Sequence, residues 1–152
     1  MRWFLLMGLA AYPLGLRAAD SPQAAAAAPA GAYNWTQPLF TPEGHLSMRL
    51  AGSEARPVGA DRIDLTDVNV TVFSGTATPI VETILLSPAA SYFPRDKRVS
   101  GTSGVRVIRF QDNREIYEIT GEDWTYEEAG KRVSIHKNVH VVYSAPLNGL
   151  AP

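Results

Sequence analysis

The residues best suited to chemistry in this chain are its three histidines, His45, His136 and His140. His136 and His140 stand four positions apart, so on one unbroken strand they would share a face, as imidazole ligands do in jelly-roll metal enzymes. Asn138 lies between them and favours a turn, and no acidic residue stands at a convincing ligand spacing. The sequence therefore argues against a metal site. The alternative, a metal-dependent jelly-roll enzyme, would require the three imidazoles to converge.

Other reactive side chains give no clear signal for an enzyme. Serine, threonine and carboxylate residues are plentiful, but none lies in a nucleophile motif such as Gly-x-Ser-x-Gly. The pairs Lys97-Arg98 and Lys131-Arg132 recur at equivalent positions and could meet lipid phosphates, but solvated hairpin turns are the simpler explanation. We expect a protein without catalytic residues, metal or cofactor.

A recurring four-residue figure indicates how the chain is built. It occurs as Asn69-Val70-Thr71-Val72, Gly104-Val105-Arg106-Val107 and Asn138-Val139-His140-Val141, so the copies start 35 (69 to 104) and 34 (104 to 138) residues apart. Val-x-Val places two β-branched side chains on one face of a strand, and the preceding Asn or Gly readily adopts positive φ. Each copy predicts a corner followed by a half-buried strand, and stacked copies would share one core.

The rest of the chain from residue 33 onward also predicts strands rather than helices. Residues 33–40 and the alternating residues 45–50 are expected strands, separated by a turn at 41–44 and followed by a turn-rich span at 52–60. Asp67 breaks the alternation of the next strand, which indicates an inserted residue or bulge. We predict an all-β fold in which two facing antiparallel sheets form an open jelly-roll-like sandwich.

The N-terminal residues have the features of an export signal. Arg2 precedes an apolar run from Trp3 to Leu16, which is shorter than the roughly 20 residues that span a bilayer, and small residues follow at Ala18 and Ala19. We therefore expect a cleaved signal, with retention as a membrane anchor as the alternative. The expected organisation is a signal peptide or anchor (1–19), an Ala/Pro-rich linker (20–32), the β domain (33–146) and a tail (147–152).

Composition limits the remaining classes of function. The hydrophobic content of 45% and charged content of 19% are those of a folded domain. The formal net charge of −1, without a dense basic patch, argues against nucleic acid as a partner. Because the chain has no cysteine, an exported domain must be stabilised by packing and strand pairing alone.

A series of short motifs follows a defined order over roughly residues 36–144. It runs from Pro42-Glu43-Gly44-x-Leu46 through Asp67-Val68-x-Val70, Tyr92, Arg98-Val99 and Gly121-Glu122-x-x-x-Tyr126 to Asn138-Val139-x-Val141. In this order the motifs resemble the LptC/LptA (OstA-like) superfamily of periplasmic lipopolysaccharide-export proteins. The turn and strand at 41–50 and the compact length look more like LptC, whereas a cleavable signal looks more like LptA.

The resemblance implies a twisted open β-jellyroll without catalytic activity. Its apolar groove would shield the acyl chains of lipopolysaccharide, and its edge strands would pair with other jellyroll proteins of an export bridge that an inner-membrane ABC transporter drives. It also implies a periplasmic location, with tethering to the inner membrane if the N-terminal segment is retained.

The apolar stripe of the predicted strands supplies the groove candidates. They are Leu46, Met48, Leu50, Val70, Val72, Val105, Val107, Val139 and Val141. The same residues could form a closed core, and Tyr92, Trp124 and Tyr126 could either cap a groove or pack between sheets. A filled core with an exposed aromatic platform would favour the alternative function, a structural or carbohydrate-binding β-sandwich of the cell envelope.

Overall fold

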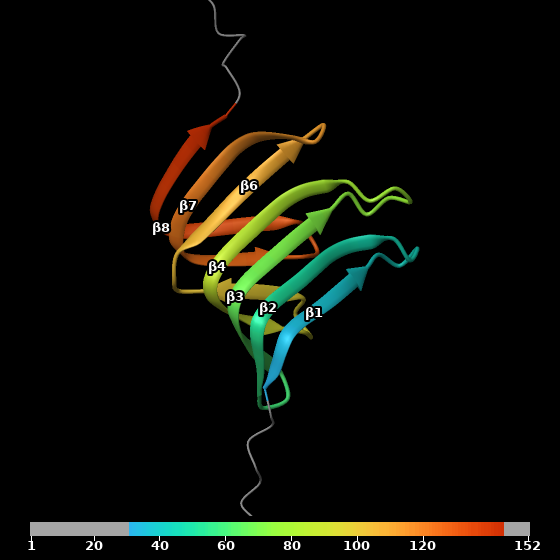
Figure 1. Ribbon diagram of the computed structural model, residues 1–152, viewed down its shortest axis with the longest axis vertical. Coiled ribbons are helices and arrows are strands. Elements are labelled where there is room, and N and C mark those ends of the chain that lie inside the picture. Colours follow the sequence, from blue (N-terminus) through green and yellow to red (C-terminus); the bar gives the residue numbers. More distant parts are fainter. Residues whose placement is uncertain (1–30, 145–152) are drawn as a thin grey trace, which may run out of the picture.

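The computed structural model describes residues 31–144 as a single antiparallel sheet of eight strands, with no helix in that range (Figure 1). The strands are β1 (Ala32–Phe40), β2 (Leu46–Val58), β3 (Arg62–Phe73), β4 (Val81–Phe93), β5 (Arg98–Gly101), β6 (Val105–Gln111), β7 (Arg114–Glu127) and β8 (Arg132–Tyr143). The all-β prediction is therefore confirmed.

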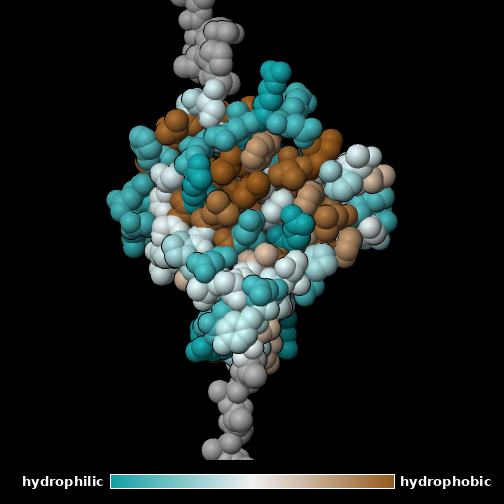
Figure 2. Space-filling model, in the orientation of Figure 1, coloured by the Kyte–Doolittle hydropathy of each residue, from teal (hydrophilic) through white to brown (hydrophobic). Residues whose placement is uncertain are grey.

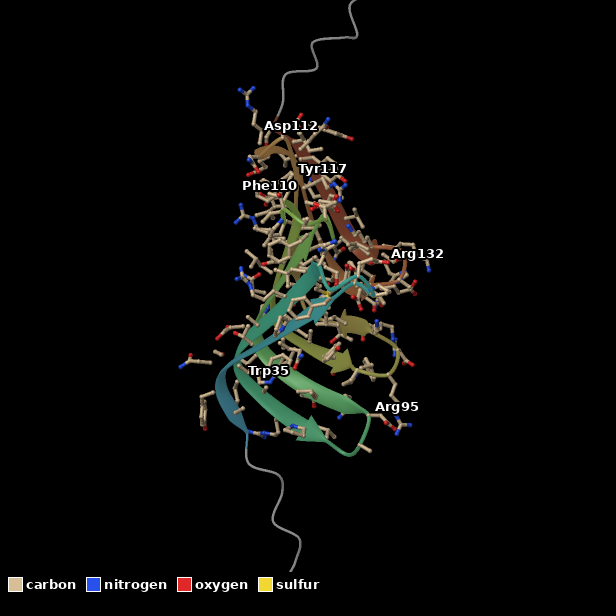
Figure 3. All side chains as sticks on the ribbon, turned by 90° about the vertical axis from the view of Figure 1, so that its right-hand side faces the viewer. Trp35, Arg95, Phe110, Asp112, Tyr117 and Arg132 are labelled. Carbon is tan, nitrogen blue, oxygen red and sulfur yellow. The ribbon has the colours of Figure 1, made fainter. Side chains whose placement is uncertain are left out.

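The sheet is a meander that bends across its middle. Both β5 and β6 pair with β4 on one side and β7 on the other, so they act as one long strand interrupted at residues 102–104. We call the half of the sheet around β6 the β6 arm and the half around β5 the β5 arm; the bent strands run through both (Figures 1 and 3). The two facing sheets of the prediction are thus two arms of one twisted, open jellyroll.

The three copies of the four-residue figure lie on β3, β6 and β8, in the β6 arm. Across that arm the strands follow the order β3-β4-β6-β7-β8, so the copies occupy every second strand and run in the same direction. The interval of about 34 residues is therefore the length of two bent strands and their connections.

Residues with positive φ lie at the bend of several strands. The sequence predicted positive φ at the first residue of each copy of the four-residue pattern, but only one of these three residues has it. Asn138 has a φ of 51°, whereas Asn69 and Gly104 do not have positive φ, and Asp67 (49°) takes that place on β3. Asp67 has no paired residue on β2 or β4, but the register of both pairings is the same on either side of it, so the inserted residue or bulge expected there is not present. Its carboxylate accepts a hydrogen bond from Ser53 at 2.8 Å, and local bonding of this kind suits Asp and Asn to positive φ.

The turn-rich span predicted at 52–60 is wrong, because β2 continues to Val58 and the chain turns at Gly59. Gly52 lies within β2 and not in a turn. A Cβ at this position would lie 2.9 Å from the carbonyl oxygen of Thr66, so glycine lets β3 approach β2 closely near the bend. By contrast, the expected turn at 41–44 is present and is closed by a 2.9 Å bond from Gly44 N–H to the Thr41 carbonyl.

Apolar side chains from both arms fill the space between them. The core contains Met48, Leu50, Val70, Val72, Leu85, Val105 and Val107 of the β6 arm, and Ala55, Leu65, Ala90, Tyr92, Val99, Trp124 and Tyr126 of the β5 arm. Figure 3 shows the bend from the side, with Trp35 near it and Asp112 and Arg95 at the tips of the two arms.

Several sequence expectations fall on residues outside 31–144. The signal peptide or anchor at 1–19, most of the linker at 20–32, residues 145–146 of the predicted domain and the tail at 147–152 lie outside the described residues. Within residues 31–144, no helix meets the length and hydropathy needed to cross a bilayer.

Candidate functional site

The inner face of the β6 arm carries one continuous apolar row. Consecutive strand pairings join Leu50 to Val70, Val70 to Leu85, Leu85 to Val107, Val107 to Ile119 and Ile119 to Val141. Directly paired residues project from the same face of a sheet, so all six side chains face the interior side. Exposure rises along the row from 0% at Leu50 to 41% at Val141.

The nine groove candidates therefore divide into two groups. Six of them, Met48, Leu50, Val70, Val72, Val105 and Val107, are buried in the common core. Leu46 is half-buried at the start of β2, and Val139 and Val141 are exposed on β8. The stripe is thus a closed core along most of its length and an open apolar surface only at β8.

Aromatic residues of the β5 arm close the interior. Trp124 and Tyr126 are each 1% exposed, and Tyr92, also buried, contacts Trp35 with ring centroids 6.5 Å apart. The Trp124 indole lies over Gly101, where an added Cβ would come within 2.8 Å of Nε1. Of the two roles considered for these aromatics, packing between the layers is the one the structure shows.

Polar side chains of the β7–β8 turn bridge the two arms. Lys131 Nζ donates to the carbonyl oxygens of Phe73 (2.8 Å) and Ser74 (3.2 Å) and pairs with Glu82 at 3.0 Å. Glu128 Oε1 accepts a 2.9 Å hydrogen bond from the Ser47 hydroxyl. Lys131 is therefore not a freely solvated turn residue, which corrects the simpler of the two expectations for it.

The other predicted basic residues are engaged locally. Lys97 and Lys131 both have positive φ at equivalent turn positions, which agrees with the repeat. Arg98 lies over the Phe93 ring at 4.3 Å, and Arg132 pairs with Glu127 at 2.7 Å within its own hairpin. None of these contacts indicates a preformed phosphate site.

The buried phenols next to this turn have altered proton affinity. Burial raises the pKa of Tyr126, and the nearby Glu128 and Glu82 carboxylates raise it further. Burial and Glu128 likewise raise the pKa of Tyr92. Tyr126 Oη and Glu128 Oε2 are buried without a hydrogen-bond partner, so polar groups at this turn are incompletely satisfied.

The two terminal strands of the described sheet are its edges. β1 pairs with β2 and β8 with β7, each on one side only among residues 31–144. The β8 edge is notably apolar, with Val139, Val141, Val142 and Tyr143 exposed by 54%, 41%, 50% and 64%. Tyr143 also contacts Tyr117 edge-on at 6.2 Å. An exposed apolar edge of this kind is suited to strand addition.

The outer surfaces of the two arms differ in chemistry. In Figure 2, apolar side chains gather over the β6 arm and hydrophilic ones surround them. This agrees with β6, in which Val107 and Ile108 are both buried although they project from opposite faces. The outer face of the β5 arm instead has an open hollow of about 730 Å³, whose polar lining includes Arg56, Asp64 and Ser100.

The metal alternative finds no support in the geometry. Within residues 31–144, His, Cys, Asp and Glu side chains form no group of three or more that could hold a metal ion, so His45, His136 and His140 do not converge.

The geometry defines a class of protein: a twisted, open β-jellyroll with a filled interior and, within residues 31–144, two edge strands. Among solved structures, the chain is similar to the crystal structure of LptH, "the LptA homologous periplasmic component of the conserved lipopolysaccharide transport device from Pseudomonas aeruginosa". The TM-score is 0.50, with 12% sequence identity, over 76% of this chain and 94% of LptH. At this identity the likeness concerns the fold. No family model matches the sequence. No curated protein matches it either.

Proposed function

We propose that this chain is a non-enzymatic periplasmic component of lipopolysaccharide export. Its inner face would shield the acyl chains, and its edges would pair with neighbouring jellyroll proteins. The fold shared with LptH supports this proposal, as do the ordered motifs of the sequence. The observation that carries it is the apolar row that runs without interruption from the buried Leu50 to the exposed Val141.

Burial of hydrocarbon supplies the driving force for such binding. Each methylene removed from water contributes about 0.8 kcal/mol, so even a short segment of acyl chain gains several kcal/mol on an apolar surface. The β8 end of the row is already accessible, whereas the interior is filled by Trp124 and Tyr126. We therefore place first contact with an acyl chain at Val139 and Val141, with deeper burial requiring the arms to separate.

The edges supply the means of assembly. β1 and β8 lie at opposite ends of the strand order, so one copy could receive a strand at each end and extend a continuous sheet. Pairing at β8 would also carry the inner apolar row into the next protein. The LptC-like role, tethering to the inner membrane and an inner-membrane ABC transporter as partner belong to the same proposal and rest on the sequence resemblance.

The test is in-cell photocrosslinking with a probe at Val141 and a matched control at Val142. The two residues are adjacent and similarly exposed, but Val141 faces the interior side and Val142, paired with Glu118, faces the outer side. We expect a lipopolysaccharide adduct at Val141, a weaker one at the buried Val105 and none at Val142. Equal adducts at Val141 and Val142, or none at either inner-face position in a folded and exported protein, would contradict the proposal.

The polar hollow on the outer face favours a second candidate, a carbohydrate-binding module. Alternating donors and acceptors line it: Arg56 pairs with Glu54 at 2.9 Å, and Ser91 donates to Asp64 at 2.7 Å. Mixed donors and acceptors suit a neutral polyhydroxyl ligand. In an amide-resolved NMR titration with lipid-free oligosaccharide, shifts confined to this hollow would favour the module over the lipid carrier, and no shifts there would remove it.

A further inference from the structure

The two arms are joined on their open side by a small set of polar contacts. We call this set the clasp: Glu128 and Lys131 of the β7–β8 turn, with their partners Ser47, Glu82 and the carbonyls of residues 73 and 74. The partners lie on β2, β4 and the end of β3, far from residues 128–131 in the sequence. In Figure 3 the β7–β8 hairpin, marked by Arg132, lies opposite the bend and between the tips of the two arms.

The β7–β8 turn is held to its own arm by a separate contact. Glu128 N–H donates to the Lys97 carbonyl at 3.1 Å, so the turn is joined to the β4–β5 turn beside it. Arg95 of that β4–β5 turn in turn pairs at 2.9 Å with Asp61 of the β2–β3 turn, in the same arm. The β5 arm is thus connected along its tips, and the clasp is where that connected unit reaches across to the β6 arm.

The clasp is built to be released more readily than the core around it. Lys131 and Glu82 retain 37% and 30% side-chain exposure, so water can replace their ion pair at little cost. Tyr126 Oη is buried without a partner, and Glu128 Oε2 has no hydrogen bond and only a 3.7 Å ion pair with Lys97, so opening would hydrate two groups that closure leaves incompletely satisfied. These two terms oppose closure, whereas the apolar contacts inside favour it.

We infer that the clasp is a gate on the interior: when its contacts break, the arms separate and the inner apolar row becomes accessible from the open side. The inference rests on the proposed lipid function for the identity of the entering ligand, an acyl chain. The opening itself is a property of the chain and does not depend on which ligand enters.

Opening can be measured without any ligand, because the chain contains no cysteine. In the full chain, Val72→Cys places a single thiol at a site that is 1% exposed and one residue from the clasp partner Phe73. Adding Lys131→Met should raise the rate of thiol modification about tenfold, the effect expected from losing one charged hydrogen-bonding group. Arg132→Met is the matched control, since Arg132 pairs with Glu127 inside the same hairpin, and it should leave the rate unchanged. Equal rates in the two variants would overturn the inference.

A locked variant tests the gate in the opposite direction and does not depend on a weakened fold. Ser47→Cys with Glu128→Cys places thiols where the two side chains meet at 2.9 Å, and a short reductant-cleavable thiol crosslinker joins the arms there. With a photoprobe at Val105, joining should abolish the lipopolysaccharide adduct and reductant should restore it, while a probe at Val141 reacts in both states. An adduct at Val105 that is the same in both states would overturn the gate and leave the lipid function intact. Faster modification in Lys131→Met, with no adduct in any variant, would support the gate and reject the lipid function.

Discussion

The two ends of the inner apolar row have the same chemistry and opposite exposure. Leu50 on β2 is fully buried, whereas Val141 on β8, at the far end of the same row, is 41% exposed. The difference comes from what faces them: the β5 arm covers β2 to β4 with large side chains such as Trp124, whereas β8 is the last strand of the described sheet. A row of apolar residues thus identifies the inner face, and the opposite layer decides whether it is core or surface.

The sharpest test of this comparison is stability. Leu50→Ala should lower the free energy of unfolding by about 3 kcal/mol, because it leaves a cavity in a filled core. Val141→Ala should lower it by only about 0.5 kcal/mol, because the side chain is already partly in water. Urea denaturation of both variants measures the difference. Similar losses would mean that β8 is covered in solution, for example by a second copy, and that its apolar side chains are not exposed.

The sequence correctly predicted which side chains share one face of a strand. It did not predict which of those faces another layer buries. Period-2 alternation places Met48, Leu50, Val70 and Val72 on one face, because side-chain direction is a local property of an extended chain. Burial of the same residues depends on side chains of β5 and β7 that become neighbours only after the sheet bends. The stripe was therefore identified by residue, whereas its division into a buried part and an exposed β8 part was not.

The bend gives the second comparison, between a central strand and the edge. Asp67 on β3 and Asn138 on β8 both have positive φ, and alanine is strained at either position. Each substitution also removes one side-chain hydrogen bond, from Ser53 to Asp67 at 2.8 Å or from Asn138 to Glu122 at 3.1 Å. Asp67→Ala should cost about 1.5 kcal/mol, because β3 is paired on both sides, whereas Asn138→Ala on the edge strand should cost about 0.7 kcal/mol. Glycine at either site should recover most of the loss. Thermal unfolding of the four variants would contradict this ranking if the edge substitution were the more costly.

The sequence located the bend of β3 only approximately, because positive φ occurs at Asp67 and not at Asn69. The interruption at Asp67 was visible in the sequence as a break in alternation, but the Asn-Val figure pointed two residues further on. The clasp was not visible at all, since Lys131 and Glu128 reach partners on β2 to β4 that nothing in their own turn specifies. Contacts between bent arms follow from strand register and the angle of the bend, which no short window of sequence contains.

In the β5 arm, which covers the buried part of the row, Tyr126→Phe should stabilise the protein by about 1 kcal/mol at neutral pH. The phenol is buried and its oxygen has no partner, so the substitution removes an unsatisfied group and keeps the ring. Burial raises the pKa of Tyr126 above its unfolded value near 10, so the unfolded chain ionises first and wild-type stability should fall as pH rises above about 10. Tyr126→Phe should reduce that alkaline slope, and Tyr92, whose pKa is also raised, should account for what remains. A destabilised Phe variant would mean that the hydroxyl has a partner in solution.

The smallest expected effect lies at the exposed end. Tyr143 is 64% exposed and touches Tyr117 edge-on at 6.2 Å, so Tyr143→Ala should cost only about 0.5 kcal/mol. Tyr143→Phe keeps the ring pair and should cost nothing. If β8 is a docking edge, however, the alanine variant should weaken lipopolysaccharide adducts at the neighbouring Val141 far more than it weakens the fold, because it removes apolar surface from the entry to the row. Loss of stability without loss of adduct would show that Tyr143 belongs to the folded sheet alone, and would place the entry nearer Val139.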